Sequence, residues 1–212
     1  MSTSMVRIML VDDHAIVRAG FRRLLEQQAD YHVVAEAADA ERAYVLFVEH
    51  EPDVVVMDLS MPGVSGLDTI RRIMVRQPTA RILVFSMHED AALAERAIQL
   101  GARGYVTKSS APETLAAAVA EVVAGKLALS PDISQSLAIL KVTGDGNPVN
   151  LLSAREFEIF RLLAGGHSVA TIAGLLSLSA KTVANYHSLI KQKLGIASDV
   201  ELVLLAQRQN LG

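Results

Sequence analysis

The stretch Asp53-Val-Val-Val-Met-Asp-Leu-Ser-Met-Pro-Gly63 decides the fold of this chain. Its four consecutive apolar residues make a run as long as a short strand. A continuous run of this kind is typical of a strand that is buried on both faces of a parallel sheet. The run ends at Asp58 and is followed by a Pro-Gly turn. The sequence therefore predicts a central strand that presents Asp58 at its carboxyl end.

The same pattern recurs along the first 125 residues, where short runs rich in Val, Ile and Leu alternate with longer segments of helical period. This alternation is typical of βα units around a parallel sheet. Strands are expected at Val6–Val11, His32–Glu36, Asp53–Met57, Arg81–Phe85 and Gly104–Val106. Helices are expected near 14–27, 40–49, 66–76, 89–99 and 112–124. The sequence thus predicts an α/β domain over residues 1–125, with a five-stranded, doubly wound parallel sheet.

Residues 126–149 are rich in turn formers and are predicted to be a linker. The remainder, residues 150–212, is predicted to be a small all-α domain. Two Ser-x-x-Glu capping boxes begin helices near residues 154 and 199. Ser168 and Ser179 can cap two further helices, and Gly195 can end the longer one. Two short helices and a longer third one indicate a helix-turn-helix.

Composition limits the classes of function. The 212 residues suit two domains, and the absence of cysteine excludes disulfides and thiolate metal sites. No cationic, apolar leader and no apolar run of about 18 residues are present, so a soluble cytoplasmic protein without membrane contact is expected. The net charge of −3 divides into −5 over residues 1–140 and +2 over residues 141–212. Only the C-terminal part therefore favours a polyanion.

Polar side chains follow four of the predicted strands. Asp12 and Asp13 follow the first strand, Asp58 the third, Ser86 the fourth and Lys108 the fifth. Ligands of open parallel sheets bind beyond the carboxyl ends of the strands. Three crowded carboxylates repel one another unless a cation lies among them, and Mg²⁺ is the hard divalent ion that oxygen ligands favour. Each acid alone is equally compatible with a helix cap or a turn, so it is their common edge that indicates a site.

The motifs Leu10-Val-Asp-Asp13, Val55-Val-Met-Asp-Leu-Ser-Met-Pro-Gly63 and Gly104-Tyr-Val-Thr-Lys108 resemble the signatures of the receiver domain, a flavodoxin-like fold. The resemblance implies that Asp58 accepts a phosphoryl group from a sensor histidine kinase. It implies a Mg²⁺ site made by Asp13, Asp58 and the backbone carbonyl of Ser60, with Asp12 acting through water. It also implies that Lys108 pairs with the phosphoryl oxygens and that Ser86 turns toward them.

Tyr105 would be the aromatic ring that moves inward behind Ser86, although a half-buried sheet residue is an equally good interpretation. Ser109 stands where many receivers have a proline after the lysine, often with a cis peptide. No cis bond is therefore expected here.

The segments Leu152-Ser-Ala-Arg-Glu156, Ile172-Ala-Gly-Leu-Leu-Ser-Leu-Ser179 and Ile190-Lys-Gln-Lys-Leu-Gly195 resemble the LuxR-type DNA-binding domain. Joined to a receiver, they resemble the NarL/FixJ class of response regulators and look closer to its branch of GacA, UvrY and BvgA. A recognition helix in the major groove is implied. The residues expected to contact DNA are Lys181, Thr182, Asn185, Tyr186, Ser188, Lys191 and Lys193.

The last predicted helix resembles the dimer-forming helix of that class, with Val200, Val203 and Leu204 as the contact residues. Alternatively, this helix only closes the core of its domain. The expected function is that of a transcription factor that binds an operator with two half-sites as a homodimer when phosphorylated.

Two other functions are compatible with parts of the sequence. One is a Mg²⁺-dependent phosphatase that uses Asp58 as a covalent nucleophile on small substrates. Nothing in the chain resembles a cap over such a site, so the protein is expected to catalyse only its own phosphoryl acceptance and loss. The other is a regulator whose helical domain is an adaptor for proteins instead of DNA.

Overall fold

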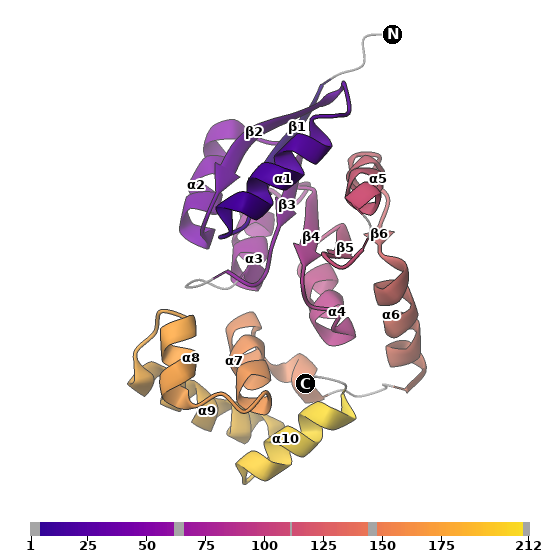
Figure 1. Cartoon of the computed structure of the whole chain (residues 1–212). Helices are drawn as coiled ribbons and strands as arrows, with labels where there is room; N and C mark the ends of the chain where they lie inside the picture. Colours follow the sequence, from indigo (N-terminus) through magenta and orange to yellow (C-terminus); the bar gives the residue numbers. More distant parts are fainter. Residues whose placement is uncertain (1–4, 62–65, 111, 144–147, 210–212) are drawn as a thin grey trace.

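A computed structural model describes residues 5–61, 66–110, 112–143 and 148–209, and it contains a parallel sheet flanked by helices and a separate all-helical part (Figure 1). The strands are β1 (Val6–Val11), β2 (Tyr31–Ala37), β3 (Val54–Met57), β4 (Ile82–Ser86), β5 (Gly104–Thr107) and β6 (Ala128–Leu129). The helices around the sheet are α1 (Ala15–Leu25), α2 (Ala40–His50), α3 (Gly66–Arg76), α4 (Ala91–Gln99), α5 (Pro112–Val123) and α6 (Pro131–Thr143).

The strands lie in the order β2-β1-β3-β4-β5-β6, and all neighbouring pairs are parallel. Successive residues of a strand point to opposite faces, so Ile8 and Leu10 of β1 pack with α1 and α5 on one side. Met9 and Val11 pack with α2, α3 and α4 on the other side. The prediction of a doubly wound sheet is therefore confirmed.

The prediction of five strands is one too few. Ala128 and Leu129 form β6, which pairs with Gly104 and Tyr105 of β5. The segment predicted as a linker also contains α6, which packs against α4 and β5. A two-residue strand is too short for an alternation of apolar and polar residues to be visible in the sequence. Residues 144–147 of the predicted linker lie outside the described residues.

The C-terminal part consists of the 3₁₀-helix η1 (Pro148–Leu151) and the helices α7 (Ala154–Ala164), α8 (Val169–Leu175), α9 (Ala180–Leu194) and α10 (Asp199–Arg208). Ser153 and Glu156 form both halves of the predicted capping box. At α10 the Ser198 side chain accepts from the Glu201 N–H, but the Glu201 carboxylate accepts from the Ala197 N–H. The predicted helix starts at residues 154 and 199 are confirmed.

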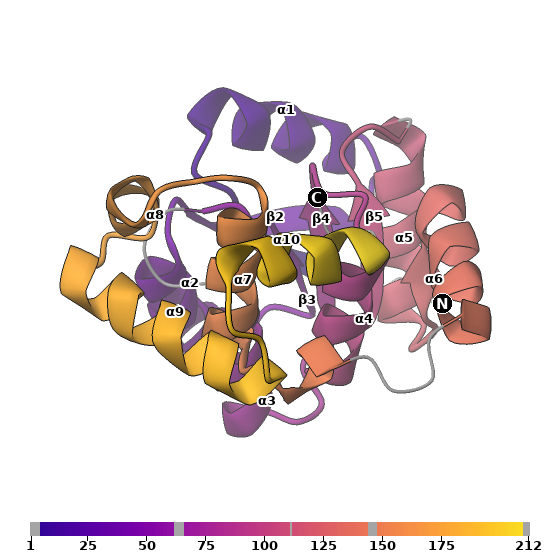
Figure 2. The same cartoon turned by 90° about the horizontal axis from the view of Figure 1, so that it is seen from below.

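The helical part lies beside the carboxyl edge of the sheet, with α7 in contact with α3 (Figure 1). Arg96 of α4 donates a hydrogen bond to the backbone carbonyl of Leu152, which joins the two parts near η1. Seen from below, α10 and α9 lie nearest to the viewer and the sheet lies behind them (Figure 2). Among the described residues, no helix has both the length and the apolar character that a membrane span needs.

Candidate functional site

Three predicted site residues meet at the carboxyl edge of the sheet. Asp12 follows β1 and Asp58 follows β3, and these two strands are neighbours in register. The Nζ atom of Lys108, after β5, lies 2.5 Å from Oδ2 of Asp12 and 2.6 Å from Oδ2 of Asp58. The Asp58 side chain is only 2% exposed. Lys108 therefore forms a charged bridge between two carboxylates that are shielded from bulk solvent.

Burial alone would lower the pKa of Lys108, but the hydrogen bonds from its ammonium group to Asp12 and Asp58 outweigh burial and raise it. Lys108 is therefore a cation at neutral pH. Arg18 of α1 donates to the backbone carbonyl of Asp12, at 2.5 Å, while its guanidinium also pairs with Glu36 at 3.4 Å. Arg18 therefore does not bind the Asp12 carboxylate. The three carboxylates of Asp12, Asp13 and Asp58 outnumber the one lysine that bridges two of them.

Backbone groups fix the orientation of Asp58. The Ser60 N–H donates to Oδ1 of Asp58 at 3.0 Å, so the carboxylate is held from one side by the loop and from the other by Lys108. A Cβ atom on Gly66 would lie 2.8 Å from the Cα atom of Leu59 and 3.1 Å from the carbonyl oxygen of Asp58. Only a glycine therefore lets the start of α3 approach this loop so closely.

Asp13 supports the interpretation of this edge as a cation site. Its buried Oδ1 atom accepts no hydrogen bond among the described residues, although Nδ1 of His14 lies 2.8 Å away. One potential ligand atom each from Asp12, Asp13 and His14 lies within 4.8 Å of the others. A buried carboxylate oxygen without a donor is costly unless a cation neutralises it. The donor set, which is dominated by carboxylates, fits a hard divalent ion such as Mg²⁺.

Ser86 and Tyr105 are completely buried beside this edge. The Tyr105 hydroxyl donates to the backbone carbonyl of His88 at 2.9 Å, and burial is the largest cause of its raised pKa. Tyr105 is thus fully inside the domain, not half-buried. All described peptide bonds are trans, as expected from Ser109.

The outer face of α9 displays several of the residues that were predicted to contact DNA. Lys181, Asn185 and Ser188 are exposed. Lys181 has no hydrogen bond or ion pair with any described residue, whereas Ser188 donates to the backbone carbonyl of Ala184. Core residues Val183 and Ile190 anchor the opposite face of the helix. The helix therefore presents a cation and an amide side chain to solvent on a rigid support.

Two family models match the chain: the response regulator receiver domain over residues 8–120, and the bacterial regulatory proteins of the luxR family over residues 150–206. The chain is 39% identical to the response regulator GacA of Pseudomonas aeruginosa over 209 residues, 98% of both chains. It is 37% identical to the response regulator UvrY of Escherichia coli over 209 residues, 98% of this chain and 96% of UvrY. The chain belongs to the LuxR family of two-component response regulators.

A solved structure supports the same assignment for this response regulator. RcsB from Salmonella enterica serovar Typhimurium, bound to a promoter in the presence of the phosphomimetic BeF₃⁻, is 30% identical and has a TM-score of 0.69. The match covers 97% of this chain and 100% of the RcsB chain. The regulator is therefore a DNA-binding signalling protein and not a metabolic enzyme.

Other predicted DNA contacts of this response regulator have partners within the chain. Lys191 pairs with Asp199 at 3.1 Å, and Lys193 pairs with the capping-box residue Glu156 at 2.7 Å. Tyr186 was predicted to lie on the outer face of the helix. Instead, it is half-buried and packs against the apolar core. The Thr182 hydroxyl lies 2.8 Å from that of Ser179 at the helix cap. The sequence pattern of one helix does not reveal the partners of Lys191 and Lys193, which lie on other helices.

The Lys193–Glu156 pair leads to a prediction about stability. Changing Lys193 to methionine removes the partner of a carboxylate that is only 3% exposed, and this is expected to cost about 1–3 kcal/mol of unfolding free energy. Burial raises the pKa of Glu156, but the hydrogen bonds from Lys193 and Ser153 outweigh burial and lower it. The pair therefore stabilises the fold above the unfolded pKa of about 4.3, and its effect disappears as pH falls through the lower folded value.

Urea unfolding of the two proteins at neutral and acidic pH measures this difference. Lys181→Met is the matched control, because Lys181 lies on the same helix without a partner, and it should change stability by no more than about 0.5 kcal/mol. If Lys193→Met and the wild type were equally stable at pH 7, the Lys193–Glu156 pair would not stabilise the fold. Lys193 would then be available to contact DNA.

The predicted dimer residues of α10 lie mainly on its outer side. Val200 is 68% exposed and Leu204 is 47% exposed, whereas Val203 is partly buried. Leu202 and Ala206 are buried in the domain core. The helix therefore closes the core with one face and leaves an apolar face in solvent, so the two interpretations from the sequence are compatible.

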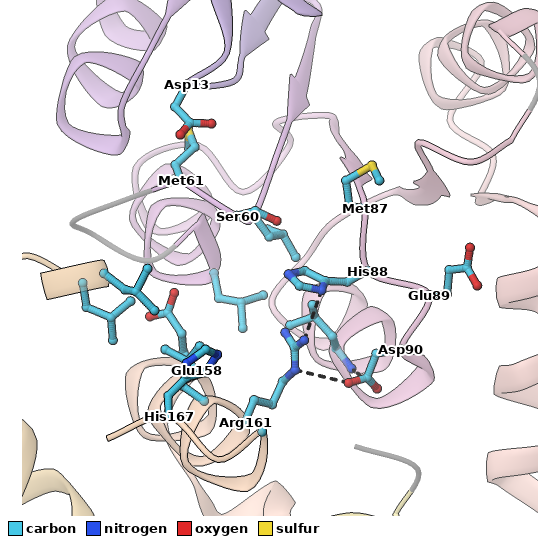
Figure 3. A pocket seen from close by; sticks show the side chains of 17 residues that line it. Asp13, Ser60, Met61, Met87, His88, Glu89, Asp90, Glu158, Arg161 and His167 are labelled. Carbon is cyan, nitrogen blue, oxygen red and sulfur yellow. Dashed lines mark hydrogen bonds and ion pairs between the residues drawn. The ribbon is translucent and has the colours of Figure 1, made fainter. Parts of the chain in front are cut away.

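The residues that join the two domains of this response regulator were not predicted from the sequence. Asp13 and Ser60 line one side of a hollow of about 760 Å³, and Glu158, Arg161 and His167 line the side that belongs to the helical domain (Figure 3). Arg161 contacts His88 and Asp90 in the β4–α4 loop. Asp90 caps α4, and no local pattern in the sequence identifies Arg161 as its partner.

Proposed function

We propose that this chain is a transcription factor whose DNA binding is controlled by phosphorylation of Asp58 by a partner histidine kinase. The observation that carries the proposal is the bridge from Lys108 to Asp58 and Asp12 at the carboxyl edge of the sheet. Asp58 is the acceptor because it ends the central strand β3 and is oriented by both the Ser60 N–H and Lys108. Asp12 and Asp13 belong to the neighbouring strand end.

The chemistry follows from the nucleophilic carboxylate. An oxygen of Asp58 attacks the phosphorus of a phosphohistidine, the P–N bond breaks, and the departing imidazole nitrogen takes up a proton. The product is a mixed anhydride between the carboxyl group and phosphate. Charge develops on the phosphoryl oxygens, and the buried ammonium group of Lys108 stabilises it. Attack of water on phosphorus later returns Asp58 and inorganic phosphate, so the protein acts only on its own phosphoryl group.

Asp13, Asp58 and the backbone carbonyl of Ser60 would hold Mg²⁺, with Asp12 assisting through water. The ion supplies positive charge that offsets the carboxylates and the incoming phosphoryl oxygens. The buried Oδ1 atom of Asp13 accepts no hydrogen bond from the described residues, and this supports its role as a direct ligand.

Asp13→Ala is therefore expected to weaken Mg²⁺ binding by more than about tenfold, since even groups that only orient the ligands are worth 10–100-fold. Calorimetric titration of the full chain with MgCl₂ measures the affinity. Glu121→Gln is the control, because Glu121 is an exposed acid near the C-terminal end of α5, whereas Lys108 comes shortly before the N-terminal end of that helix. An Asp13→Ala protein that binds Mg²⁺ as tightly as the wild type would remove Asp13 from the site.

Ser86 and Tyr105 act as the switch in this proposal. Once Asp58 carries phosphate, the Ser86 hydroxyl turns toward the phosphoryl oxygens and Tyr105 adjusts behind it. Both side chains are buried next to the site, and the Tyr105 hydroxyl already holds the backbone of the β4–α4 loop. A change at Asp58 can therefore reach the surface through this loop.

The helical domain would place α9 in the major groove, with Asn185 at base edges and Lys181 at a phosphate. Phosphorylation favours a homodimer through the apolar face of α10, and the dimer binds an operator with two half-sites. The RcsB structure, bound to a promoter with a phosphomimetic, is consistent with this order of events. Gel shifts with genomic fragments, with and without acetyl phosphate, test the proposal, and a chain that binds no DNA in either condition would act as a protein adaptor instead.

A further inference from the structure

Another cavity, of about 550 Å³, lies between the receiver and the helical domain. Helices α3 and α4 supply one wall, and α9 and the start of α7 supply the other (Figure 1). The polar residues that line it are Asp68, Arg71, Arg96, Ser153, Arg155 and Tyr186. The lining includes none of the carboxylates of the phosphoryl site, nor Lys108. The cavity is therefore separate from that site, and its volume is that of a pocket for a small organic molecule.

The lining of this cavity is positively charged. It contains three arginines, one each from α3, α4 and α7, namely Arg71, Arg96 and Arg155. Its one carboxylate is that of Asp68, 3.8 Å from Arg71, so three positive charges and one negative charge give the lining a formal charge of +2. Glu158 pairs with Arg155 at 2.7 Å but does not line the cavity. Because like charges repel when they are crowded, an anion inside the cavity lowers the energy of the cluster.

Two of the three guanidinium groups are held in place by backbone carbonyls. Arg96 donates to the carbonyl oxygen of Leu152, and Arg155 donates to that of Leu176 at 3.2 Å. The Arg155 side chain is only 13% exposed. A guanidinium presents five N–H donors in a planar fork that matches the oxygens of a phosphoryl group. Groups that are already held in position lose little freedom when a ligand binds, so the cavity is prepared for an anion.

We propose that this cavity binds a small phosphorylated metabolite, whose phosphoryl oxygens accept hydrogen bonds from the arginines of both domains. A phosphoryl group carries a charge of about −1.5 to −2 at pH 7 on three acceptor oxygens, so it can meet donors that approach from different sides. A single carboxylate has only two oxygens and one charge. Binding requires neither Mg²⁺ nor transfer of the phosphoryl group, so the inference does not depend on phosphorylation of Asp58.

A ligand in this cavity would contact both domains at once. Arg71 and Arg96 belong to the receiver, whereas Arg155 and Tyr186 belong to the helical domain. A ligand that binds only one arrangement of a protein stabilises that arrangement by mass action. The metabolite therefore favours the arrangement in which the domains are in contact, and its concentration becomes an input to the regulator in addition to the kinase.

Calorimetric titration of the full chain with sodium pyrophosphate tests the proposal. Pyrophosphate supplies two linked phosphoryl groups, and EDTA is added so that, without Mg²⁺, the carboxylates of Asp12 and Asp58 repel an anion from the phosphoryl site. Ionic strength is held constant with NaCl. The wild type is expected to show saturable binding of one pyrophosphate per chain. Citrate is titrated in parallel, and a chain that binds citrate but not pyrophosphate would overturn the assignment of a phosphorylated ligand.

Two variants, one in each domain, locate the bound pyrophosphate. Arg155→Lys keeps a positive charge beside Glu158 but loses the planar fork, and it should weaken binding at least about tenfold. Arg71→Gln should weaken binding about two- to fivefold, because Arg71 is 64% exposed and exposed charges contribute less. Arg76→Gln is the matched control, since Arg76 is an exposed arginine of the same helix that does not line the cavity. The control should bind pyrophosphate as the wild type does.

Three results of the titrations would overturn the proposal. The first is a wild type without saturable binding. The second is unchanged affinity in both Arg155→Lys and Arg71→Gln. The third is an equal loss in Arg71→Gln and Arg76→Gln, which would indicate general attraction to the charge of α3.

Nitrogen-15 NMR of the wild type keeps the test decisive if a variant does not fold. Pyrophosphate should shift the arginine Nε–H signals of the cavity. Shifts confined to the outer face of α9 would instead place the anion on the proposed DNA-binding surface, and they would contradict the inference.

Discussion

Asp58→Asn is expected to reduce phosphoryl labelling of the chain by acetyl phosphate and Mg²⁺ to background. The amide has nearly the shape of the carboxylate and keeps an oxygen that can accept from the Ser60 N–H. It lacks the anionic oxygen that attacks phosphorus, so folding is preserved while the reaction is lost. Intact-protein mass spectrometry measures the effect, because the wild type should gain the mass of one phosphoryl group and the variant none.

Asp53→Asn is the matched control for this change. Asp53 lies directly before β3, where its carboxylate accepts from the Arg7 N–H, and an asparagine oxygen can do the same. Labelling of this protein should equal that of the wild type. If labelling survived in Asp58→Asn and disappeared in Asp13→Asn, the acceptor would be Asp13, and the assignment of the two carboxylates would be reversed.

Asn185→Ala is expected to change which DNA sequences the phosphorylated regulator prefers. Loss of one base contact costs about 1–3 kcal/mol at a single position, which is about 5- to 150-fold in affinity. Asn185 is exposed on α9 with no hydrogen bond among the described residues, so its loss should leave the fold intact. Selection from a randomised DNA pool in the presence of acetyl phosphate measures the preference at each position.

Lys181→Ala is the comparison variant, since Lys181 is exposed on the same helix and is expected to meet a phosphate. Its loss should weaken binding to all sequences alike and lower the salt slope by about 1. Lys193 is not a suitable comparison, because its removal also leaves the buried carboxylate of Glu156 without its cationic partner. Selected sequences that are identical for Asn185→Ala and the wild type would exclude Asn185 from base recognition.

The features that the sequence predicts are those determined within one segment. Apolar runs place β1 and β3, because a strand that is buried on both faces is apolar almost throughout. Serine caps place the starts of α7 and α10, since the capping hydrogen bond joins residues three apart. The meeting of Asp12, Asp58 and Lys108 follows from the rule that parallel strands share one carboxyl edge.

The features that were missed depend on contacts between distant segments. β6 is a strand only because the edge of β5 is available to pair with it. The pairing of Lys193 with Glu156 depends on how α9 crosses α7, which no spacing in the sequence encodes. Arg161 and His88 are 73 residues apart in the chain. Their contact depends on the placement of one domain against the other.

DNA binding of the wild type and of Asp58→Asn, measured side by side with and without acetyl phosphate and Mg²⁺, tests the central claim most directly. Fluorescence anisotropy with a labelled genomic fragment that the phosphorylated protein retains gives the four affinities under equal salt. The account predicts salt-dependent binding that the phosphodonor tightens for the wild type and leaves unchanged for Asp58→Asn. Equal tightening in both proteins, or the absence of salt-dependent DNA binding by the wild type in either condition, would contradict it.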